Sequence, residues 1–219
     1  MERKVHIKPH KISRLNEIAP GVFILAFERT FSFVPGQVVA LDVTQDKKPR
    51  LYSIASGADS HEVEILFDVR KNGYLTPKLS ELRAGNTIFA SEPFGQFMCD
   101  SEPAWWIATG TGIAPFASMA QSGLFTNKHL VYGGRFRNSF YYDQLFSKHY
   151  PKNYIRCISQ EEASDCYSGR LTKYLAEVEE LPGNHKYYVC GSAEMVVDVR
   201  DILIDRGVPY KQIIAETYF

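Results

Sequence analysis

The first 98 residues alternate between short apolar runs and turn signals. Apolar runs at 22–27, 37–43 and 61–69 are separated by Pro-Gly pairs and a polar Gly-containing segment. Such spacing is typical of short antiparallel strands in a barrel or sandwich. A short helix is expected at 76–82, with Thr76 as its cap and a proline in its first turn.

From residue 104 onward the pattern changes to strands that alternate with helices. Strands are expected at 104–108, 129–132, 154–158, 187–190 and 212–215, and helices at 114–121, 139–148, 171–178 and 192–206. Alternation of this kind predicts a doubly wound parallel sheet with crossover helices. A polar stretch at 99–103 separates the two patterns, so we expect domains at 1–98 and 99–219.

Composition narrows the class of protein. The 219 residues include 25 Lys and Arg and 25 Asp and Glu, and this zero net charge argues against nucleic-acid binding. The first residues lack the apolar stretch of a signal peptide, and no apolar run is long enough for a membrane span. The 4 cysteines form no C-x-x-C pair and no zinc spacing with histidine. We expect a cytoplasmic protein without a structural metal.

A glycine-rich turn with Gly110, Thr111 and Gly112 follows the first strand of the second half and opens a helix. Glycines there let the backbone approach a phosphate, and the helix start offers free N–H groups. Pro115 stands where the third glycine of G-x-G-x-x-G would be. The turn is therefore either a tight connection or part of a dinucleotide site.

Three further positions follow strands of the same predicted sheet. Cys190 and Gly191 end one strand, and Ser192 is placed to cap the next helix. This loop is either an ordinary turn with a buried thiol or the floor of a nicotinamide site. Arg135 and Arg170 follow two other strands and are either phosphate ligands or solvated charges.

In the first half, residues 50–56 combine a cation, an aromatic ring and two hydroxyl groups. They fit a nucleotide cofactor or simply a strand with alternating polar positions. Residues 73–76 precede the short helix and suit either a phosphate group or an ordinary helix start. The sequence ends with two aromatic residues, which pack on the core or stack on a planar ligand.

Taken in order, these motifs resemble the ferredoxin–NADP reductase family over essentially the whole chain. The residues that carry the resemblance are Arg-x-Tyr-Ser-x-x-Ser at 50–56, Gly-Thr-Gly-x-Ala-Pro at 110–115 and Cys-Gly at 190–191. The compact size and the Tyr-Phe ending are most similar to the bacterial branch. The resemblance implies an FAD-binding β-barrel followed by an NADP-binding α/β domain.

The resemblance also implies the roles of the FAD residues. Arg50 would pair with the pyrophosphate, Tyr52 would stack on the flavin, and Ser53 would hydrogen-bond near its N5. Tyr218 would cover the flavin face and Phe219 would stack on the adenine. The implied FAD residues are Arg50, Leu51, Tyr52, Ser53, Gly73, Tyr74, Leu75, Thr76, Thr111, Tyr218 and Phe219.

A second implied set would bind NADP. These residues are Gly110, Thr111, Gly112, Arg135, Ser159, Gln160, Arg170, Cys190, Ser192, Ala193, Glu194 and Asp198. The implied catalytic residues are Ser53, Cys190, Glu216 and Tyr218. Relatives that prefer NADPH commonly have Ser-Arg where this chain has Ser159-Gln160. Arg135 and Arg170 match the other family arginines, so NADPH is favoured, with NADH or dual use left open.

The family implies hydride transfer between NADP(H) and the flavin, and single-electron exchange with ferredoxin or flavodoxin. The acceptor is expected to be a separate protein because the chain has no cysteine cluster for an iron–sulfur centre. Residues 1–98 carry 13 Lys and Arg against 11 Asp and Glu, a small excess that would attract an acidic partner or merely keep a strand solvated. The chain itself is expected to be a monomer.

Other interpretations remain open from the sequence alone. Within enzymes, the alternatives are the reductase component of an oxygenase system and an NAD(P)H-dependent flavin reductase. Outside enzymes, they are a non-catalytic nucleotide-binding regulator and a pure interaction module.

Overall fold

The chain folds into two compact units. The computed structural model describes residues 5–150 and 152–218. The first unit comprises the described part of Met1–Met98 together with Ala114–Ser122, and the second comprises Cys99–Ile113 and the described part of Gly123–Phe219. The helix at 114–121, which the sequence pattern assigns to the second domain, thus belongs to the first compact unit.

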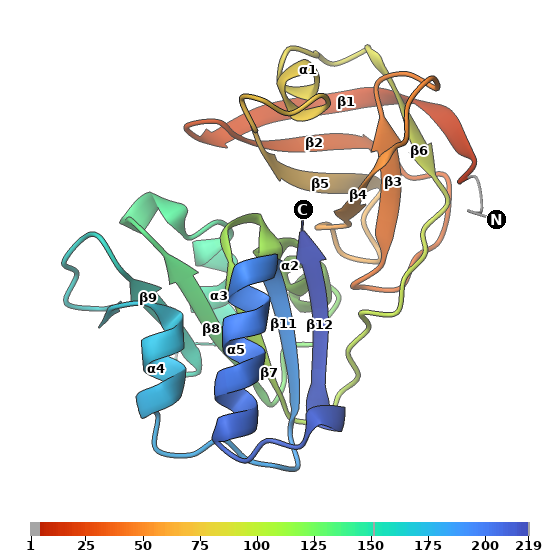
Figure 1. The fold of residues 1–219 in the computed structure, drawn as a ribbon. Coiled ribbons are helices and arrows are strands. Elements are labelled where there is room, and N and C mark those ends of the chain that lie inside the picture. The colour runs from red at the N-terminus through yellow and green to blue at the C-terminus, as the bar shows by residue number, and fades with distance from the viewer. Residues whose placement is uncertain (1–4, 151, 219) are drawn as a thin grey trace. The chain divides into compact units, whose positions relative to one another are not determined.

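One six-stranded antiparallel sheet forms the first unit (Figure 1). Its strands are β1 (Ile7–Ala19), β2 (Val22–Glu28), β3 (Val38–Asp42), β4 (Arg50–Ser53), β5 (Glu62–Asp68) and β6 (Thr87–Ser91). They lie in the order β4-β3-β6-β1-β2-β5, and an antiparallel bridge between Ile54 and Ile65 links the two edges. The predicted antiparallel barrel is confirmed.

The barrel core is made of side chains that alternate inward along the strands. Phe27, Ile65 and Leu41 belong to one buried cluster, against which α1 (Thr76–Ser80) places Leu79. The predicted cap of α1 is wrong. Leu75 occupies the N-cap position, and the Thr76 hydroxyl instead accepts a hydrogen bond from the backbone N–H of Arg70 at 2.8 Å.

The second unit is a six-stranded sheet in which all strands are parallel. Its strands are β7 (Ala104–Thr109), β8 (Lys128–Gly134), β9 (Tyr154–Ile158), β10 (Tyr167–Ser168), β11 (Lys186–Ser192) and β12 (Ile213–Tyr218). They lie in the order β10-β9-β8-β7-β11-β12. β8, β9 and β10 are thus added on one side of β7, and β11 and β12 on its other side. The predicted doubly wound α/β fold is confirmed, and the carboxyl ends of β7 and its neighbours are where such sheets bind ligands.

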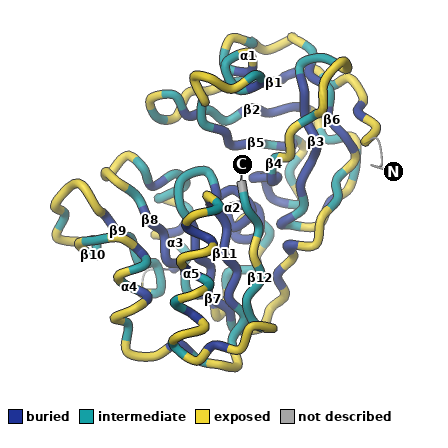
Figure 2. Tube along the Cα trace, in the orientation of Figure 1, coloured by how far each residue is buried: buried dark blue, intermediate teal, exposed yellow. Residues whose placement is uncertain are grey.

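Helices cover both faces of this sheet (Figure 1). The elements are η1 (Gly110–Ile113), η2 (Arg137–Ser139), α3 (Asp143–His149), α4 (Leu171–Glu177), α5 (Ala193–Asp205) and η3 (Tyr210–Gln212). Trp105 and Ile107 pack into the cluster beneath α4 and α5, whereas Trp106 contacts Tyr150 on the α3 side. β7 is therefore buried on both faces (Figure 2), as its continuous apolar sequence requires.

α2 (Ala114–Gln121) and the residue that follows it are held in the first unit by three hydrogen bonds. The Ser118 hydroxyl donates to the carbonyl of Ser56 at 2.7 Å, and the Gln121 amide donates to the carbonyl of Ala55 at 2.8 Å. The backbone N–H of Ala58 donates to the Ser122 hydroxyl at 2.9 Å. Residues 114–120 are all buried, so α2 has almost no solvent face.

Several elements differ from the expected ones. β1 was not predicted because only Ile7 and Ile12 along it are buried, and β6 because polar residues begin and end its short apolar run. β10 is too short to carry a pattern. The helix expected at 139–148 begins only at Asp143. Tyr142 before it has a positive φ of 58°, which no regular helix accommodates, and residues 137–139 form a separate 3-10 turn.

Candidate functional site

The glycine turn lies directly against the end of β11. A Cβ atom on Gly112 would stand 2.3 Å from the carbonyl oxygen of Cys190, so only glycine fits there. Gly110 has a positive φ of 53°, and nothing lies within 4 Å of its Cβ position. η1, which includes the half-buried Thr111, therefore packs closely on one side and is open at Gly110.

The end of β11 is equally tight. Cys190 is fully buried, and a Cβ on Gly191 would lie 2.5 Å from the Thr109 hydroxyl. Ser192 caps α5 as predicted, accepting a hydrogen bond from the backbone N–H of Met195 at 3.3 Å. The other predicted residues here lie on the first turns of α5, with Ala193 half-buried and both Glu194 and Asp198 exposed.

The predicted phosphate-binding residues also meet at the carboxyl edge of the sheet. The backbone N–H of Ser159 donates to the carbonyl of Gly134 at 3.1 Å, and that of Gln160 to the carbonyl of Arg135 at 3.0 Å. Arg170 immediately precedes α4. Arg135 and Arg170 are exposed, and neither forms an ion pair with a carboxylate of the described residues.

Beside them lies an ionic cluster that sequence reasoning missed. The Arg137 guanidinium donates to both carboxylate oxygens of Asp165, one of them at 2.7 Å, and the Arg156 guanidinium donates to Asp165 at 2.8 Å. The hydrogen bond from Arg137 lowers the pKa of Asp165 to about 2. The only signal in the sequence was a second arginine two positions after Arg135.

In the barrel, the predicted cofactor segment occupies β4 at the edge of the sheet. Arg50 is exposed and forms no ion pair with a described carboxylate, and the Leu51 side chain is 56% exposed. Tyr52 is half-buried against the barrel core, and burial raises the pKa of its phenol. Ser53 is buried. An unpaired guanidinium next to an exposed leucine suits an anionic ligand with an apolar part.

The segment 73–76 lies at the rim of the same core cluster. The Tyr74 ring has two ammonium groups over it, with Nζ of Lys47 at 4.0 Å and Nζ of Lys78 at 4.2 Å from its centroid. Its hydroxyl lies 3.3 Å from the hydroxyl of Thr44. Gly73 is exposed, and Leu75 is buried. The two lysines were missed by the sequence reasoning and add positive charge to this segment.

β12 brings the last predicted residues to the carboxyl edge. Glu216 is half-buried and lies in register with Cys190 on β11. Tyr218 is in register with Ser192, but its side chain and the whole of Phe219 lie outside the described residues. Their predicted contacts with the flavin and the adenine stay predictions.

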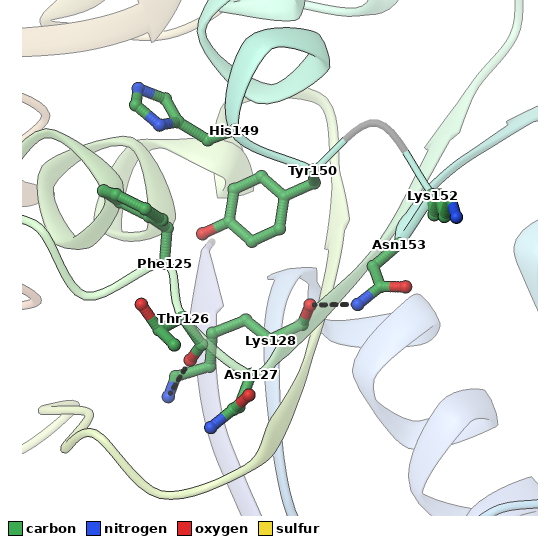
Figure 3. A pocket seen from close by; sticks show the side chains of 8 residues that line it. All are labelled: Phe125, Thr126, Asn127, Lys128, His149, Tyr150, Lys152 and Asn153. Atoms are coloured by element: carbon green, nitrogen blue, oxygen red, sulfur yellow. Dashed lines mark hydrogen bonds between the residues drawn. The ribbon is translucent and has the colours of Figure 1, made fainter.

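A cavity of about 380 Å³ lies elsewhere in the second unit (Figure 3). It is lined by residues that precede or begin β8 and β9, together with the end of α3, among them Phe125, Lys128 and Tyr150. This is the amino edge of the parallel strands, opposite the glycine turn. None of the predicted site residues lines it.

The described residues contain no group of three His, Cys, Asp or Glu side chains that could hold a metal ion. Within the same residues no helix is long and apolar enough to cross a membrane. All four cysteines are free thiols.

Two protein-family models match successive parts of the chain. Residues 11–99 match the model of the oxidoreductase FAD-binding domain, and residues 106–201 match that of the oxidoreductase NAD-binding domain. The fold and the site thus define an FAD- and NAD(P)-dependent oxidoreductase.

Individual relatives identify the family. Ferredoxin–NADP reductase B of Sorangium cellulosum is 30% identical, with 95% of this chain and 96% of the relative covered. A toluate 1,2-dioxygenase electron transfer component of Pseudomonas putida is 26% identical over 90% of this chain, which spans only 63% of that protein. A ferredoxin–NADP reductase structure from Neisseria gonorrhoeae, with bound FAD and NADP, matches all of both chains with a TM-score of 0.86 at 20% identity. The chain belongs to the ferredoxin–NADP reductase family.

Proposed function

We propose that this oxidoreductase exchanges electrons between NADP(H) and a separate one-electron carrier through bound FAD. The observation that carries the proposal is the contact of Gly112 with the Cys190 carbonyl. It joins the glycine turn to the end of β11 and keeps side chains out of the place where their backbones meet. Closely packed backbone of this kind, at the carboxyl edge of a doubly wound sheet, suits a nicotinamide dinucleotide.

The barrel residues fit FAD. Arg50 offers a planar guanidinium with no competing ion pair among the described residues, and Leu51 offers exposed apolar surface. Lys47 and Lys78 add positive charge around Tyr74, as a pyrophosphate requires. A bound flavin would supply the hydride and single-electron chemistry that no side chain of this chain provides.

Other residues would position the flavin and the nicotinamide nucleotide. We assign Ser53 the hydrogen bond to the flavin at its reactive edge, following the family resemblance. Cys190 and Glu216, adjacent across β11 and β12, would line the nicotinamide position. The start of η1 and the capped start of α5 would hold the nucleotide phosphates and ribose.

We further propose NADP(H) as the preferred nucleotide. Arg135 and Arg170 are exposed, unpaired with described carboxylates, and close to the loop of Ser159 and Gln160. Two guanidinium groups at this place favour the doubly charged 2′-phosphate of NADP.

The acceptor we propose is ferredoxin or flavodoxin, with the protein acting as a cytoplasmic monomer. This follows the reductase from Sorangium cellulosum, which this chain matches almost end to end. A second candidate is the reductase component of an oxygenase, because the electron transfer component from Pseudomonas putida is also similar.

The test is an anaerobic electron-transfer assay with the FAD-loaded protein and NADPH. Oxidised ferredoxin, oxidised flavodoxin and free FMN are offered separately, with protein-free mixtures as controls. We expect reduction of ferredoxin or flavodoxin to be much faster than reduction of FMN. Preferential reduction of free FMN would favour a flavin reductase, and no reduction of any acceptor would contradict the proposal.

A further inference from the structure

At the carboxyl end of β8, one carboxylate lies between two guanidinium groups. The Arg137 guanidinium donates two parallel hydrogen bonds to the Asp165 carboxylate, and Arg156 donates a third at 2.8 Å. Paired arginines around a planar anion form a geometry that phosphate also satisfies. The side chain of Asp165 therefore occupies a binding position for an anion.

Arg137 lies in the loop after β8, where doubly wound sheets commonly contact the ribose of the nucleotide. In doubly wound sheets the residue that distinguishes a ribose 2′-hydroxyl from a 2′-phosphate follows the second strand, roughly 20 residues after the glycine turn. β8 is that strand, next to β7, and Arg137 follows it. The backbone N–H of Arg137 donates to the Glu161 carboxylate at 2.7 Å, which fixes this loop beside Gln160.

We propose that Arg137 binds the 2′-phosphate of NADP(H), and that Asp165 competes for the same guanidinium and so sets the discrimination between NADP(H) and NAD(H). The inference rests on the proposed function, because it needs a nicotinamide dinucleotide at this edge of the sheet. Arg137 would then supply a positive charge near Gln160, the neutral residue that stands where NADPH-preferring relatives commonly have an arginine.

The ion pair between Arg137 and Asp165 is exposed to solvent, so a phosphate group can reach Arg137 and replace the carboxylate. The side chains of Arg137 and Asp165 are 49% and 45% exposed, and ion pairs of this kind are weak. Asp165 is a carboxylate at neutral pH, and its hydrogen bond with Arg137 lowers its pKa further, to about 2. A phosphate monoester carries more charge, about −1.5 to −2, and three acceptor oxygens, so it can displace the carboxylate.

Arg156, the second arginine that contacts Asp165, is held in place by burial and by another carboxylate. Its side chain is only 16% exposed, and it also donates to Asp143 at 3.2 Å. Asp143 in turn accepts a hydrogen bond from the Tyr154 hydroxyl at 3.0 Å. If Asp165 moves away, Arg156 keeps this second partner, whereas Arg137 becomes available to the phosphate.

The experiment measures the dissociation constants of NADP⁺ and NAD⁺ for the FAD-loaded protein by titration calorimetry. Four proteins are compared: wild type, Arg137→Gln, Asp165→Asn and the double variant. Asp201→Asn on α5, which removes an exposed carboxylate paired with Arg200, is the matched charge control.

We expect Arg137→Gln to weaken NADP⁺ about tenfold or more and to leave NAD⁺ nearly unchanged, as loss of a charge-assisted contact predicts. Asp165→Asn should tighten NADP⁺ by about twofold to fivefold, with little effect on NAD⁺, because competition is removed. In the Arg137→Gln background, Asp165→Asn should then have no effect on selectivity.

Equal effects on both nucleotides, or a gain from Asp165→Asn that persists without Arg137, would overturn the inference. A gain of the same size in Asp201→Asn would also overturn it, because it would show a general effect of charge. Failure of the wild type to bind either nucleotide would instead contradict the proposed function, so the two failures are distinguishable.

Discussion

At the scale of single residues, Gly112 lets the glycine turn pack directly against the end of β11. Gly112 is required because the carbonyl of Cys190 fills the space where its Cβ would lie. The sequence identified this glycine from its place after a buried strand. It gave no reason to connect Gly112 with Cys190, because that contact arises only when β7 and β11 become neighbours in the sheet.

Gly112→Ala should disturb both stability and nucleotide binding. The added methyl group forces the turn away from β11, and overpacking of this kind lowers the free energy of unfolding by about 1–3 kcal/mol. We expect NADP⁺ affinity to fall as well, measured by calorimetry alongside urea denaturation. Gly183→Ala is the matched control, because its Cβ would meet no atom closer than 3.6 Å. Equal behaviour of the two variants would refute this role of Gly112.

Ser53→Ala tests the assigned flavin contact. Ser53 is buried at the end of β4, and removal of its hydroxyl changes little volume. We expect anaerobic stopped-flow measurements to show slower flavin reduction by NADPH at an unchanged FAD content. Reduction at the wild-type rate would contradict the assignment.

Arginine roles were only partly predictable. Arg50, Arg135 and Arg170 could be selected because each lies next to a recognisable strand end. Arg137 and Asp165 could not be paired from the sequence, because 27 intervening residues fold back between them through α3 and β9. The ion pair between Arg137 and Asp165 is therefore a feature that the structure adds to the arginines selected from the sequence.

At the scale of elements, buried parallel strands were the easiest to predict. β7 and β11 have apolar centres because both of their faces are covered, and such runs are visible in any sequence. β1 was missed because nearly every second residue faces solvent and polar residues interrupt its apolar positions. The start of α3 depended on the positive φ of Tyr142, which composition does not specify.

α2 shows why domain boundaries cannot be taken from alternation alone. Its sequence follows the glycine turn without a break, yet its hydrogen bonds go to residues 55–58 of the barrel unit. Predicting this would require knowledge that Ser118 and Ser56, far apart in the sequence, become neighbours.

Ser118→Ala should therefore destabilise the first unit. The change removes a 2.7 Å hydrogen bond in a fully buried environment and leaves the Ser56 carbonyl without that donor, at a cost of about 1–3 kcal/mol. Chemical denaturation measures the effect. Ser32→Ala, at an exposed position, should change stability by less than about 0.5 kcal/mol. A Ser118 variant as stable as the Ser32 control would contradict the anchoring role.

At the scale of the whole molecule, the two patterns in the sequence correspond to two folds and two family domains. Strand spacing predicted the barrel, and strand–helix alternation predicted the parallel sheet. The cofactors followed from short motifs whose chemistry is specific in combination, whereas the acceptor did not, because an acceptor is recognised by a surface rather than by a motif. The charge excess of the first half is too small to identify it.

The proposed function requires that this chain binds FAD and reduces it with a nicotinamide nucleotide. The most direct test is an anaerobic titration of the purified, FAD-supplemented protein with NADPH and, in a separate sample, with NADH, followed by visible absorption. We predict a flavin spectrum that bleaches with both nucleotides and faster with NADPH. Failure to retain flavin after addition of FAD, or a flavin that neither nucleotide bleaches, would contradict the account.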